Sequence, residues 1–340
     1  MYIRLRIINA KYLITSSMSQ MINLPLLAVV VPCYNEEPVL RDTTTQLLSV
    51  LDGLIQSGRI SPDSTILYVD DGSGDRTWQM IEEYVKTREH VNGVKLAGNV
   101  GHQNALMAGL SVAKDFADLM ISIDADLQDD IRVIPEMIDK YANDGCDIVY
   151  GVRRRRTTDT WFKRATALAF YKLMRVLGVK SVYNHADYRL MSRRAVVQLC
   201  NFRERNLFLR GIVPLIGYET SSVYYDRSER KAGESKYPFG KMLNFAIDGI
   251  TSFSVKPVRM IFAMGILFIL TAFCILFYVI HSMLLHNAVP GWASIILSIW
   301  FVGGSILIGL GVVGEYIGKI YVEVKDRPRY NIEKVTWKGK

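Results

Sequence analysis

Short apolar runs alternate with amphipathic segments through the first 150 residues of the 340-residue chain. The apolar runs have the length of strands, and the amphipathic segments have helical spacing. Strands are predicted at residues 26–32, 65–69, 93–97, 119–123 and 147–150. Helices are predicted at about 37–57, 75–89, 101–114 and 135–143. This alternation favours an α/β domain whose sheet is mostly parallel and covered on both faces.

The pattern changes after Gly151. A run of four arginines occupies residues 153–156, and two amphipathic segments follow at 161–177 and 239–253. Either segment could lie in the membrane interface, with its cationic side chains toward lipid headgroups. Alternatively, both are ordinary helices packed on the sheet, and the sequence leaves this choice open.

A stretch without Asp, Glu, Lys or Arg runs from residue 260 to residue 314. It is long enough for two membrane-spanning helices of about 20 residues each, which we place at 258–284 and 292–313. Lys and Arg lie on both outer sides of this pair, and the connecting loop 286–291 has neither. The positive-inside rule then predicts a multi-pass protein of the cytoplasmic (inner) membrane, with both termini and the α/β domain in the cytoplasm. Glycines in the second span would permit close packing within the pair or between the subunits of a homo-oligomer.

These boundaries divide the chain into five parts. Residues 1–24 are a leader, either disordered or preceding the true start, without the long apolar core of a signal peptide. Residues 25–238 form the cytoplasmic α/β domain, 239–257 a juxtamembrane amphipathic helix, 258–314 the two-helix transmembrane hairpin and 315–340 a cytoplasmic tail. The four cysteines are widely spaced and form no disulfide or zinc pattern, which fits a reducing compartment.

The net charge of +8 hides an asymmetry along the chain. Residues 1–150 carry 12 Lys and Arg against 21 Asp and Glu, whereas residues 151–259 carry 22 against 8. The acidic half could hold a metal ion, and the basic block beside the predicted spans could face anionic lipid headgroups or a phosphate. A solvated basic face would explain the second block equally well.

Asp124, Ala125 and Asp126 follow the fourth predicted strand. Carboxylates at the end of a buried strand can hold a divalent cation whose remaining ligands are phosphate oxygens. The cation would neutralise the diphosphate that leaves when a sugar–diphosphate bond breaks, and the amide of Gln128 could add another oxygen. We therefore predict a divalent-cation site at Asp124 and Asp126, although an acidic sequence also produces such triplets by chance.

Two further polar clusters end predicted strands of the same sheet. Asp70 and Asp71 could accept hydrogen bonds from a nucleobase or a ribose, or they could form a turn with the glycine and serine that follow. Residues 32–37, Pro-Cys-Tyr-Asn-Glu-Glu, could present a helix N-terminus and side chains to a ligand at the same edge. Alternatively, they only cap the helix that follows. Because ligands bind at the carboxyl ends of parallel strands, these clusters predict one shared site.

A loop rich in cations spans residues 227–237, Arg-Ser-Glu-Arg-Lys-Ala-Gly-Glu-Ser-Lys-Tyr. Its side chains could clamp a lipid phosphate or a donor diphosphate. The residues predicted to do so are Arg227, Arg230, Ser235 and Lys236. The alternative is a juxtamembrane basic loop that is attracted to lipid.

Six motifs, in the same order, resemble the family 2 glycosyltransferases. They are Val-Val-Pro-Cys-Tyr-Asn-Glu-Glu, Val-Asp-Asp-Gly-Ser, Gly-His-Gln-Asn-Ala-Leu-Met-Ala-Gly-Leu, Asp-Ala-Asp-Leu-Gln-Asp, Asp187-Tyr-Arg-Leu-Met and Arg-Lys-Ala-Gly-Glu-Ser-Lys-Tyr. Within that family the chain is most similar to the polyprenyl-phosphate branch, the bactoprenol glucosyltransferases and dolichol-phosphate mannosyltransferases. The match covers the α/β domain and both predicted spans.

The resemblance implies an A-type glycosyltransferase fold and a metal-dependent, inverting transfer of a sugar from a nucleotide-sugar to a polyprenyl phosphate. By matching position, Asp124, Asp126 and Gln128 would hold Mg²⁺ or Mn²⁺. Asp187 would be the base or the carboxylate that orients the acceptor, and Asp126 would act with it in catalysis. The acceptor phosphate is already largely a dianion at neutral pH, so Asp187 is expected to orient the site more than to remove a proton. Nucleotide contacts are implied for Pro32, Tyr34, Glu36, Asp70, Asp71, Asp124 and Ala125.

The partners implied are the nucleotide-sugar, the polyprenyl phosphate and the membrane, and no nucleic acid. Glucose from UDP-glucose and undecaprenyl phosphate are the first substrates to expect. Mannose from GDP-mannose or N-acetylglucosamine from UDP-N-acetylglucosamine are alternatives. Gly98 stands where many relatives have an arginine, so one nucleotide contact is missing or replaced.

Three other classes of protein fit the sequence less well. A processive polysaccharide synthase would carry a Gln-x-x-Arg-Trp motif, which the sequence lacks. A nucleotidyltransferase would need a glycine-rich loop after the first strand, and residues 32–38 contain no glycine. A non-catalytic membrane scaffold is disfavoured because Asp71, Asp124 and Asp126 are all present.

Overall fold

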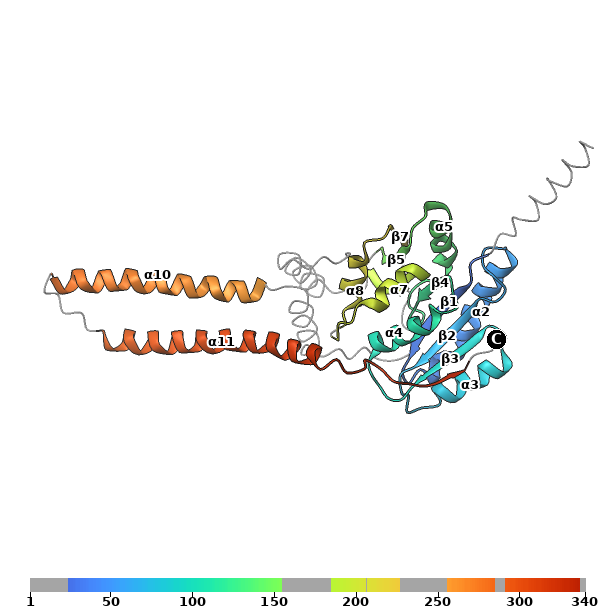
Figure 1. The fold of residues 1–340 in the computed structure, drawn as a ribbon, viewed down its shortest axis with the longest axis horizontal. Helices are drawn as coiled ribbons and strands as arrows, with labels where there is room; N and C mark the ends of the chain where they lie inside the picture. The colour runs from blue at the N-terminus through green and yellow to red at the C-terminus, as the bar shows by residue number, and fades with distance from the viewer. Residues whose placement is uncertain (1–23, 155–184, 206, 227–255, 285–290, 337–340) are drawn as a thin grey trace, which may run out of the picture.

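The computed structural model describes residues 24–154, 185–205, 207–226, 256–284 and 291–336. They form an α/β domain, from which two long helices extend side by side (Figure 1). The strands are β1 (Leu27–Cys33), β2 (Thr65–Asp70), β3 (Val91–Leu96), β4 (Leu119–Ser122), β5 (Ile148–Arg153), β6 (His185–Ser192), β7 (Thr220–Tyr225) and β8 (Ile332–Thr336). The helices are α2 (Glu37–Gln56), α3 (Thr77–Thr87), α4 (His102–Ala113), α5 (Ile134–Asp144), α7 (Arg193–Asn201), α8 (Leu209–Ile212), α10 (Lys256–Leu284) and α11 (Trp292–Val324).

A mixed sheet with the strand order β7-β5-β6-β4-β1-β2-β3-β8 forms the centre of the domain. Strands β4, β1, β2 and β3 are parallel neighbours, and β5 pairs in parallel with β7. Strand β6 is antiparallel to β4 and β5, and β8 is antiparallel to β3. The prediction of an α/β fold with a mostly parallel sheet is confirmed. The hydrophobic pattern does not predict β6, β7 or β8, because none of them is a continuous apolar run.

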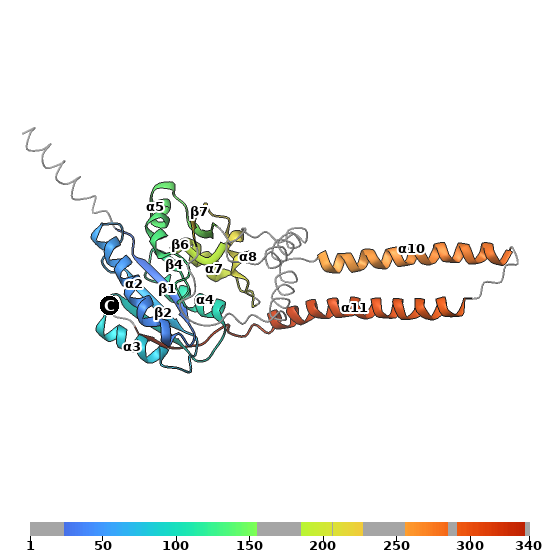
Figure 2. The same ribbon diagram turned by 180° about the vertical axis from the view of Figure 1, so that it is seen from behind.

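Alternate residues of the central strands face opposite sides of the sheet. In β1, Leu27 and Val29 pack in the core beneath α2, α3 and α5. Their neighbours Ala28 and Val30 pack beneath α4 and α7 on the other side. Figures 1 and 2 show these two helical layers from opposite directions. Burial on both sides explains why β1 reads as an unbroken apolar run.

Helices α10 and α11 contact each other through residues of the first half of α10. Phe268 of α10 and Phe301 of α11 meet edge to face, with ring centroids 5.6 Å apart. Gly309 of α11 lies against Ile261 of α10, close enough that an added Cβ would be 3.3 Å from the Ile261 methyl group. The pair therefore forms a direct helix–helix contact of the kind that small residues permit.

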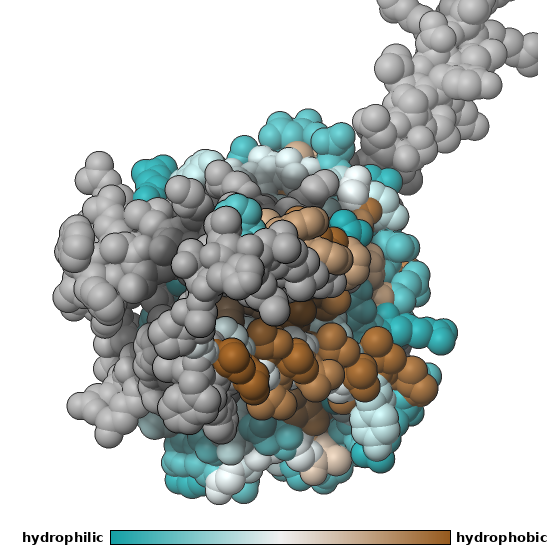
Figure 3. Space-filling view, turned by 90° about the vertical axis from the view of Figure 1, so that its left-hand side faces the viewer, coloured by the Kyte–Doolittle hydropathy of each residue, from teal (hydrophilic) through white to brown (hydrophobic). Residues whose placement is uncertain are grey.

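The outer sides of this helix pair expose large apolar side chains, such as Phe277 and Leu307. Figure 3 views the molecule from the end of the pair and shows hydrophobic surface gathered there, with a mainly hydrophilic rim behind it. By length and composition, one helical segment of the described residues, Phe301–Val324, could cross a membrane. The segment Val258–Phe268 of α10 is apolar but shorter. The structure thus gives one candidate span, and a second span stays a prediction.

After α11 the chain returns to the α/β domain, where β8 adds to the edge of β3. Lys95 of β3 pairs with Glu333 of β8 at 2.9 Å. The cytoplasmic tail predicted for 315–340 therefore includes the last turns of α11 and an edge strand of the sheet. The predicted leader and the amphipathic segments 161–177 and 239–253 lie outside the described residues, apart from residue 24.

Candidate active site

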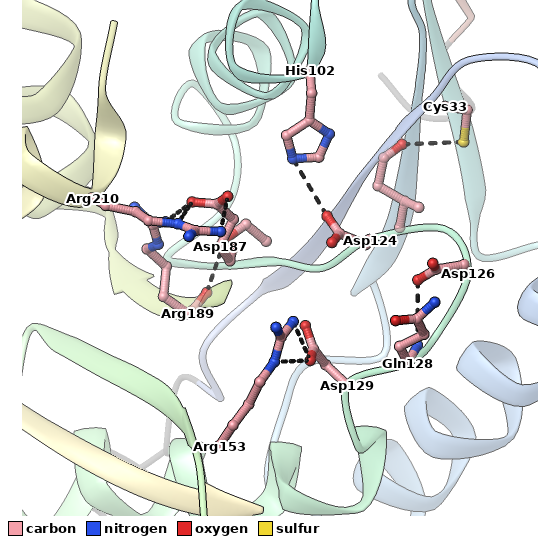
Figure 4. A network of polar contacts seen from close by, with 12 residues as sticks. Cys33, His102, Asp124, Asp126, Gln128, Asp129, Arg153, Asp187, Arg189 and Arg210 are labelled. Carbon is pink, nitrogen blue, oxygen red and sulfur yellow. Dashed lines mark hydrogen bonds and ion pairs between the residues drawn. The ribbon is translucent and has the colours of Figure 1, made fainter. Parts of the chain in front are cut away.

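The carboxyl ends of β1, β2 and β4 meet at one edge of the sheet, where the antiparallel β6 begins. Asp124 follows β4 and Asp187 lies near the start of β6. The register of these strands pairs Ser122 with Arg189, which brings the two aspartates to the same place. The Ser122 hydroxyl also donates to the carbonyl oxygen of Asp187 at 2.6 Å. Strand topology thus assembles one site from two motifs that are far apart in the sequence (Figure 4).

Asp124 lies in the middle of this edge, with its side chain 45% exposed. Its Oδ1 is 3.3 Å from Nε2 of His102, the first residue of α4. Partial desolvation by the surrounding protein raises the pKa of the Asp124 carboxyl, His102 lowers it, and the nearby Asp187 raises it again. A carboxylate crowded by other acidic groups is stabilised by any cation that binds beside it.

Asp126 and Gln128 lie in the same short loop after β4. Oδ1 of Asp126 accepts a hydrogen bond from the backbone N–H of Gln128 at 3.4 Å. Gln128 is buried, and its Nε2 has no hydrogen-bond partner among the described residues. A buried amide that the protein leaves unsatisfied fits a position beside a ligand.

The loop offers part of a metal site. Within the described ranges, no group of three or more His, Cys, Asp or Glu side chains converges as a complete set of metal ligands. Asp124, Asp126 and Gln128 instead offer two carboxylates and one amide. Mg²⁺ is commonly bound by one or two carboxylates, with phosphate oxygens and waters in the other positions. The acidic crowding around Asp124 fits such a cation. The unsatisfied Nε2 of Gln128 is a hydrogen-bond donor, so it fits an acceptor such as a phosphate oxygen beside the cation.

Asp187 is held between two arginines. Its Oδ1 accepts from Nη2 of Arg189 at 2.6 Å, and its Oδ2 accepts from Nη2 of Arg210 in α8 at 3.1 Å. Burial alone would raise the pKa of the Asp187 carboxyl, but Arg210 and Arg189 outweigh it and hold this pKa far below its usual value. A carboxylate with such a low pKa is a weak general base at neutral pH.

Asp129 fastens the loop 124–130 to the rest of the sheet. Its Oδ1 accepts from Nε and Nη2 of Arg153, at the end of β5, and from the hydroxyl of Tyr225, at the end of β7. The hydroxyl of Tyr188 donates to the backbone carbonyl of Asp130 at 3.2 Å. These contacts come from three different strands, so the loop that carries the predicted metal ligands has a defined position.

Asp70, the last residue of β2, and Asp71, which follows it, are both buried. Asp70 Oδ1 accepts from the backbone N–H of Ser73 at 3.4 Å, which corresponds to the predicted turn, and its Oδ2 has no partner among the described residues. Asp71 accepts from the backbone N–H groups of Val100 and Gly101 at 2.8 and 3.0 Å. Burial raises the pKa of both carboxyl groups. Asp71 thus anchors the loop that leads into α4.

Gly72 allows the backbone of residues 98–99, in the loop before α4, to approach the loop after β2 closely. Its φ of +69° is in the left-handed region, and an added Cβ would lie 2.7 Å from the backbone nitrogen of Asn99. Together, Asp71 and Gly72 fix the backbone that places His102 beside Asp124. The Asp-Asp-Gly motif therefore shapes the site through the loop as well as through its own side chains.

The segment 32–37 is joined to the loop after β2 by paired backbone and side-chain contacts. The Asn35 amide oxygen accepts from Gly74 N–H at 2.8 Å, and the backbone N–H of Glu36 donates to Thr77 at 2.9 Å. Tyr34 is half exposed beside them. The structure thus brings together the predicted residues Pro32, Tyr34, Glu36, Asp70 and Asp71 at neighbouring strand ends.

The predicted residues and the residues that form the site differ in part. Arg227, Arg230, Ser235 and Lys236 lie outside the described residues. Ala125 is in the loop but is buried, with its carbonyl oxygen accepting from the hydroxyl of Thr43. The sequence analysis gives no role to His102, Asp129, Arg153, Arg189 or Arg210. His102, Asp129 and Arg189 lie within the motifs that carry the family resemblance, which is their only signal in the sequence.

Comparison with known proteins agrees with the fold and the motifs. The family model described as Glycosyl transferase family 2 matches residues 28–200, from β1 to α7. The uncharacterized glycosyltransferase YkoT of Bacillus subtilis (strain 168) is 56% identical over 310 residues, which cover 91% of each chain. The SfII prophage-derived bactoprenol glucosyl transferase of Shigella flexneri is 40% identical over 317 residues, 91% of this chain and 97% of the relative. The chain therefore belongs to glycosyl transferase family 2.

A solved structure with a similar arrangement is mannosyl-3-phosphoglycerate synthase from Rubrobacter xylanophilus. It is 16% identical, with a TM-score of 0.46, over 69% of this chain and 74% of that one.

Proposed function

We propose that the protein transfers a hexose from a nucleotide-sugar to a polyprenyl phosphate at the cytoplasmic face of the membrane. Glucose, UDP-glucose and undecaprenyl phosphate are the first substrates to test, with inversion at the anomeric carbon. The main support is the 40% identity to a relative named bactoprenol glucosyl transferase. That similarity covers 91% of this chain, so it must include most of α10 and α11 as well as the α/β domain.

The donor is proposed to lie along the carboxyl edge of the sheet. Its nucleoside would contact the ends of β1 and β2, and its diphosphate would lie at the loop after β4. Asp124, Asp126 and Gln128 would hold Mg²⁺ or Mn²⁺ there. Bound at this place, the cation would neutralise the charge that develops on the leaving diphosphate. The contacts of Asp71 favour a role in which it supports the nucleotide site through the 98–101 loop.

Asp187 is proposed to position cationic groups for the reaction. The second pKa of a phosphate monoester is about 6, so the acceptor is largely a dianion at neutral pH and needs no strong base. The low pKa of the Asp187 carboxyl agrees with this, since a group that resists protonation is unsuited to accept a proton. Positioning of the acceptor and neutralisation of the leaving group would then supply most of the rate.

The membrane arrangement is part of the same proposal. Exposed apolar side chains along α10 and α11 favour a lipid environment for the pair. We propose a two-helix hairpin at 258–314, with the catalytic domain 25–238 and both termini in the cytoplasm and an interfacial helix at 239–257. Such an anchor would keep the site near an acceptor that cannot leave the bilayer. Self-association through the glycine-rich helix α11 also stays a prediction.

A direct assay tests the reaction. Purified protein in detergent, with Mn²⁺, is given undecaprenyl phosphate and a panel of radiolabelled UDP- and GDP-sugars, and transfer of label to the organic phase is measured. We expect one donor to label the lipid, a chelator to stop the labelling and added Mn²⁺ to restore it. Asp126→Ala should abolish labelling. Asp139→Ala, which removes an exposed carboxylate paired with Arg59, is the matched control and should keep it.

The possible outcomes separate the alternatives. Labelling by a GDP-sugar or by UDP-N-acetylglucosamine would correct the donor but keep the reaction. Bound nucleotide without lipid labelling by any donor would overturn the lipid acceptor and favour the non-catalytic scaffold.

A further inference from the structure

The imidazole of His102 faces the loop after β4 from the first turn of α4. Figure 4 shows the ring directed at Asp124. Its Nε2 lies 3.3 Å from Oδ1 of Asp124, and the two side chains are 43% and 45% exposed. Both the imidazole and the carboxylate can therefore be reached by a ligand from the same side of the site.

The separation of these two atoms is close to that of neighbouring ligands on one metal ion. Two ligands at right angles around an octahedral ion, each about 2.1 Å from it, lie about 3 Å apart. Nε2 of His102 and Oδ1 of Asp124, at 3.3 Å, could thus bind one cation after a small movement. An imidazolium–carboxylate ion pair has a similar separation, and the surroundings favour the shared cation.

The loop after β4 gives an independent indication of a ligand. Gln128 is 5% exposed, and its Nε2 has no hydrogen-bond partner among the described residues. A buried donor that the protein leaves unsatisfied fits an acceptor brought by a ligand, such as a phosphate oxygen. Gln128 and Asp126 belong to the same loop as Asp124 (Figure 4). A phosphate and its accompanying cation would therefore meet at the loop that His102 faces.

The backbone on both sides of His102 has a fixed position. The N–H of Gly101, before it, donates to Asp71 at 3.0 Å. The side-chain oxygen of Gln103, after it, accepts from the N–H of Leu209 at 2.8 Å. Ligands on a backbone that is already held in place need little rearrangement to bind. The imidazole is therefore presented to the loop before any ligand arrives.

We propose that Nε2 of His102 is a ligand of the divalent cation, beside Asp124. The inference rests on the metal-dependent transfer proposed above and adds a nitrogen ligand to its metal site. The remaining positions would be shared between oxygens of the loop and of the donor diphosphate. Mg²⁺ is a hard cation that takes oxygen ligands, whereas transition-metal ions also accept imidazole nitrogen. His102 would therefore favour Mn²⁺ over Mg²⁺ at this site.

The test detects the nitrogen directly. Mn²⁺ is added to the purified protein, free of tag histidines, with UDP in one sample and GDP in another, and without lipid acceptor. Electron spin echo envelope modulation then reports nitrogen nuclei bonded to Mn²⁺. We expect imidazole modulation in wild type and its loss in His102→Ala. His90→Gln is the matched control and should keep the modulation, because the His90 ring contacts the Ser64 carbonyl before β2, at the opposite edge of the sheet.

The affinity for the cation supplies a second measurement. Free Mn²⁺ is followed by its electron paramagnetic resonance signal, and Mg²⁺ is measured by competition. Loss of a group that only supports a metal ligand typically costs about 10–100-fold in affinity. Loss of the ligand itself in His102→Ala should therefore lower the Mn²⁺ affinity at least about 10-fold. The Mg²⁺ affinity should fall less, so the preference for Mn²⁺ should narrow.

These measurements need no sugar transfer, so they remain valid if the lipid acceptor is refuted. His102→Asn, which offers an amide oxygen in place of the ring nitrogen, serves if His102→Ala unfolds, and it should bind Mn²⁺ without imidazole modulation. Three results would overturn the role. They are bound Mn²⁺ without nitrogen modulation in wild type, modulation that persists in the His102 variants, and no Mn²⁺ binding by wild type with either nucleotide.

Discussion

Asp129 offers a sharp test of how the loop 124–130 is held. Its carboxylate is 2% exposed and accepts two hydrogen bonds from Arg153, at 3.0 and 2.9 Å, and one from Tyr225, at 2.6 Å. The variant Asp129→Ala removes the carboxylate that pairs with the Arg153 guanidinium, which is 20% exposed. Removing one partner of a buried ion pair costs about 3–5 kcal/mol. That is a large part of a typical free energy of unfolding of about 5–15 kcal/mol.

The expected change in melting temperature follows from this cost. In a domain of this size about 1 kcal/mol shifts the Tm by about 2–4 °C, so Asp129→Ala should lower it by about 6–20 °C. Asp139→Ala removes an exposed pair with Arg59, worth about 0–1 kcal/mol, and should lower the Tm by at most about 4 °C. Thermal unfolding is followed by intrinsic fluorescence in one detergent at one heating rate, because the Tm of irreversible unfolding depends on the rate. Equal melting temperatures for the two variants would refute the reasoning.

The same residue should also affect metal use. Changing a group that holds metal ligands in place typically costs about 10–100-fold in metal affinity or activity. Asp129→Asn, which keeps the shape of the side chain, should raise the Mn²⁺ concentration for half-maximal labelling by about this factor. Tyr225→Phe keeps the arginine pair and should have a smaller effect. A lowered Tm with unchanged metal dependence would show that Asp129 stabilises the fold without positioning the loop.

Two further predictions concern packing and pH. Gly109→Ala would place a Cβ 2.5 Å from a methyl of Val30 and should lower the free energy of unfolding by about 1–3 kcal/mol. Gly53→Ala in α2 has open space and should raise it by about 0.4–1 kcal/mol. Shifts of the same sign in the two variants would contradict one of the two assignments. The pKa of the Asp187 carboxyl is lowered on folding, so its stabilising effect is present above the unfolded pKa of about 4 and is lost only as pH falls through the lower folded value. The acid limb of a pH–rate profile should therefore follow the acceptor phosphate, near pH 6, and disappearance of that limb in Asp187→Asn would argue that Asp187 is the base.

The aspartates at the carboxyl ends of β2 and β4 could be predicted because their positions follow from the local sequence pattern. The apolar runs locate β1, β2 and β4, and residues that follow parallel strands lie at one edge whatever the loops between them do. Asp70, Asp124 and Asp126 are found in this way. The resemblance to the family adds Asp187, which lies in a strand without an apolar run.

The surroundings of these residues could not be predicted in the same way. Arg189 is fully buried, which a sequence pattern does not indicate, because its burial depends on the ion pair with Asp187. Arg210 reaches the same carboxylate from α8, a contact set by tertiary packing alone. Asp71 was predicted from the sequence, but its contacts were not. The sequence cannot distinguish a carboxylate that faces a ligand from one whose oxygens accept backbone N–H groups, as Asp71 does from Val100 and Gly101.

The position of β8 at the end of the chain means that the sheet is completed only after α10 and α11 have been synthesised. This strand pairs with β3, and Ala97 N–H donates to the Asn331 carbonyl beside it at 2.9 Å, yet the ribosome makes both long helices between these two strands. Until residue 336 emerges, the edge of β3 is an unpaired strand of the kind that recruits wrong partners. The nascent α/β domain must therefore wait, incomplete, while α10 and α11 are synthesised. Strand β8 can pair with β3 only after synthesis of the helices that we propose to be the membrane anchor. The catalytic domain would therefore complete its folding at the membrane, where its proposed acceptor resides.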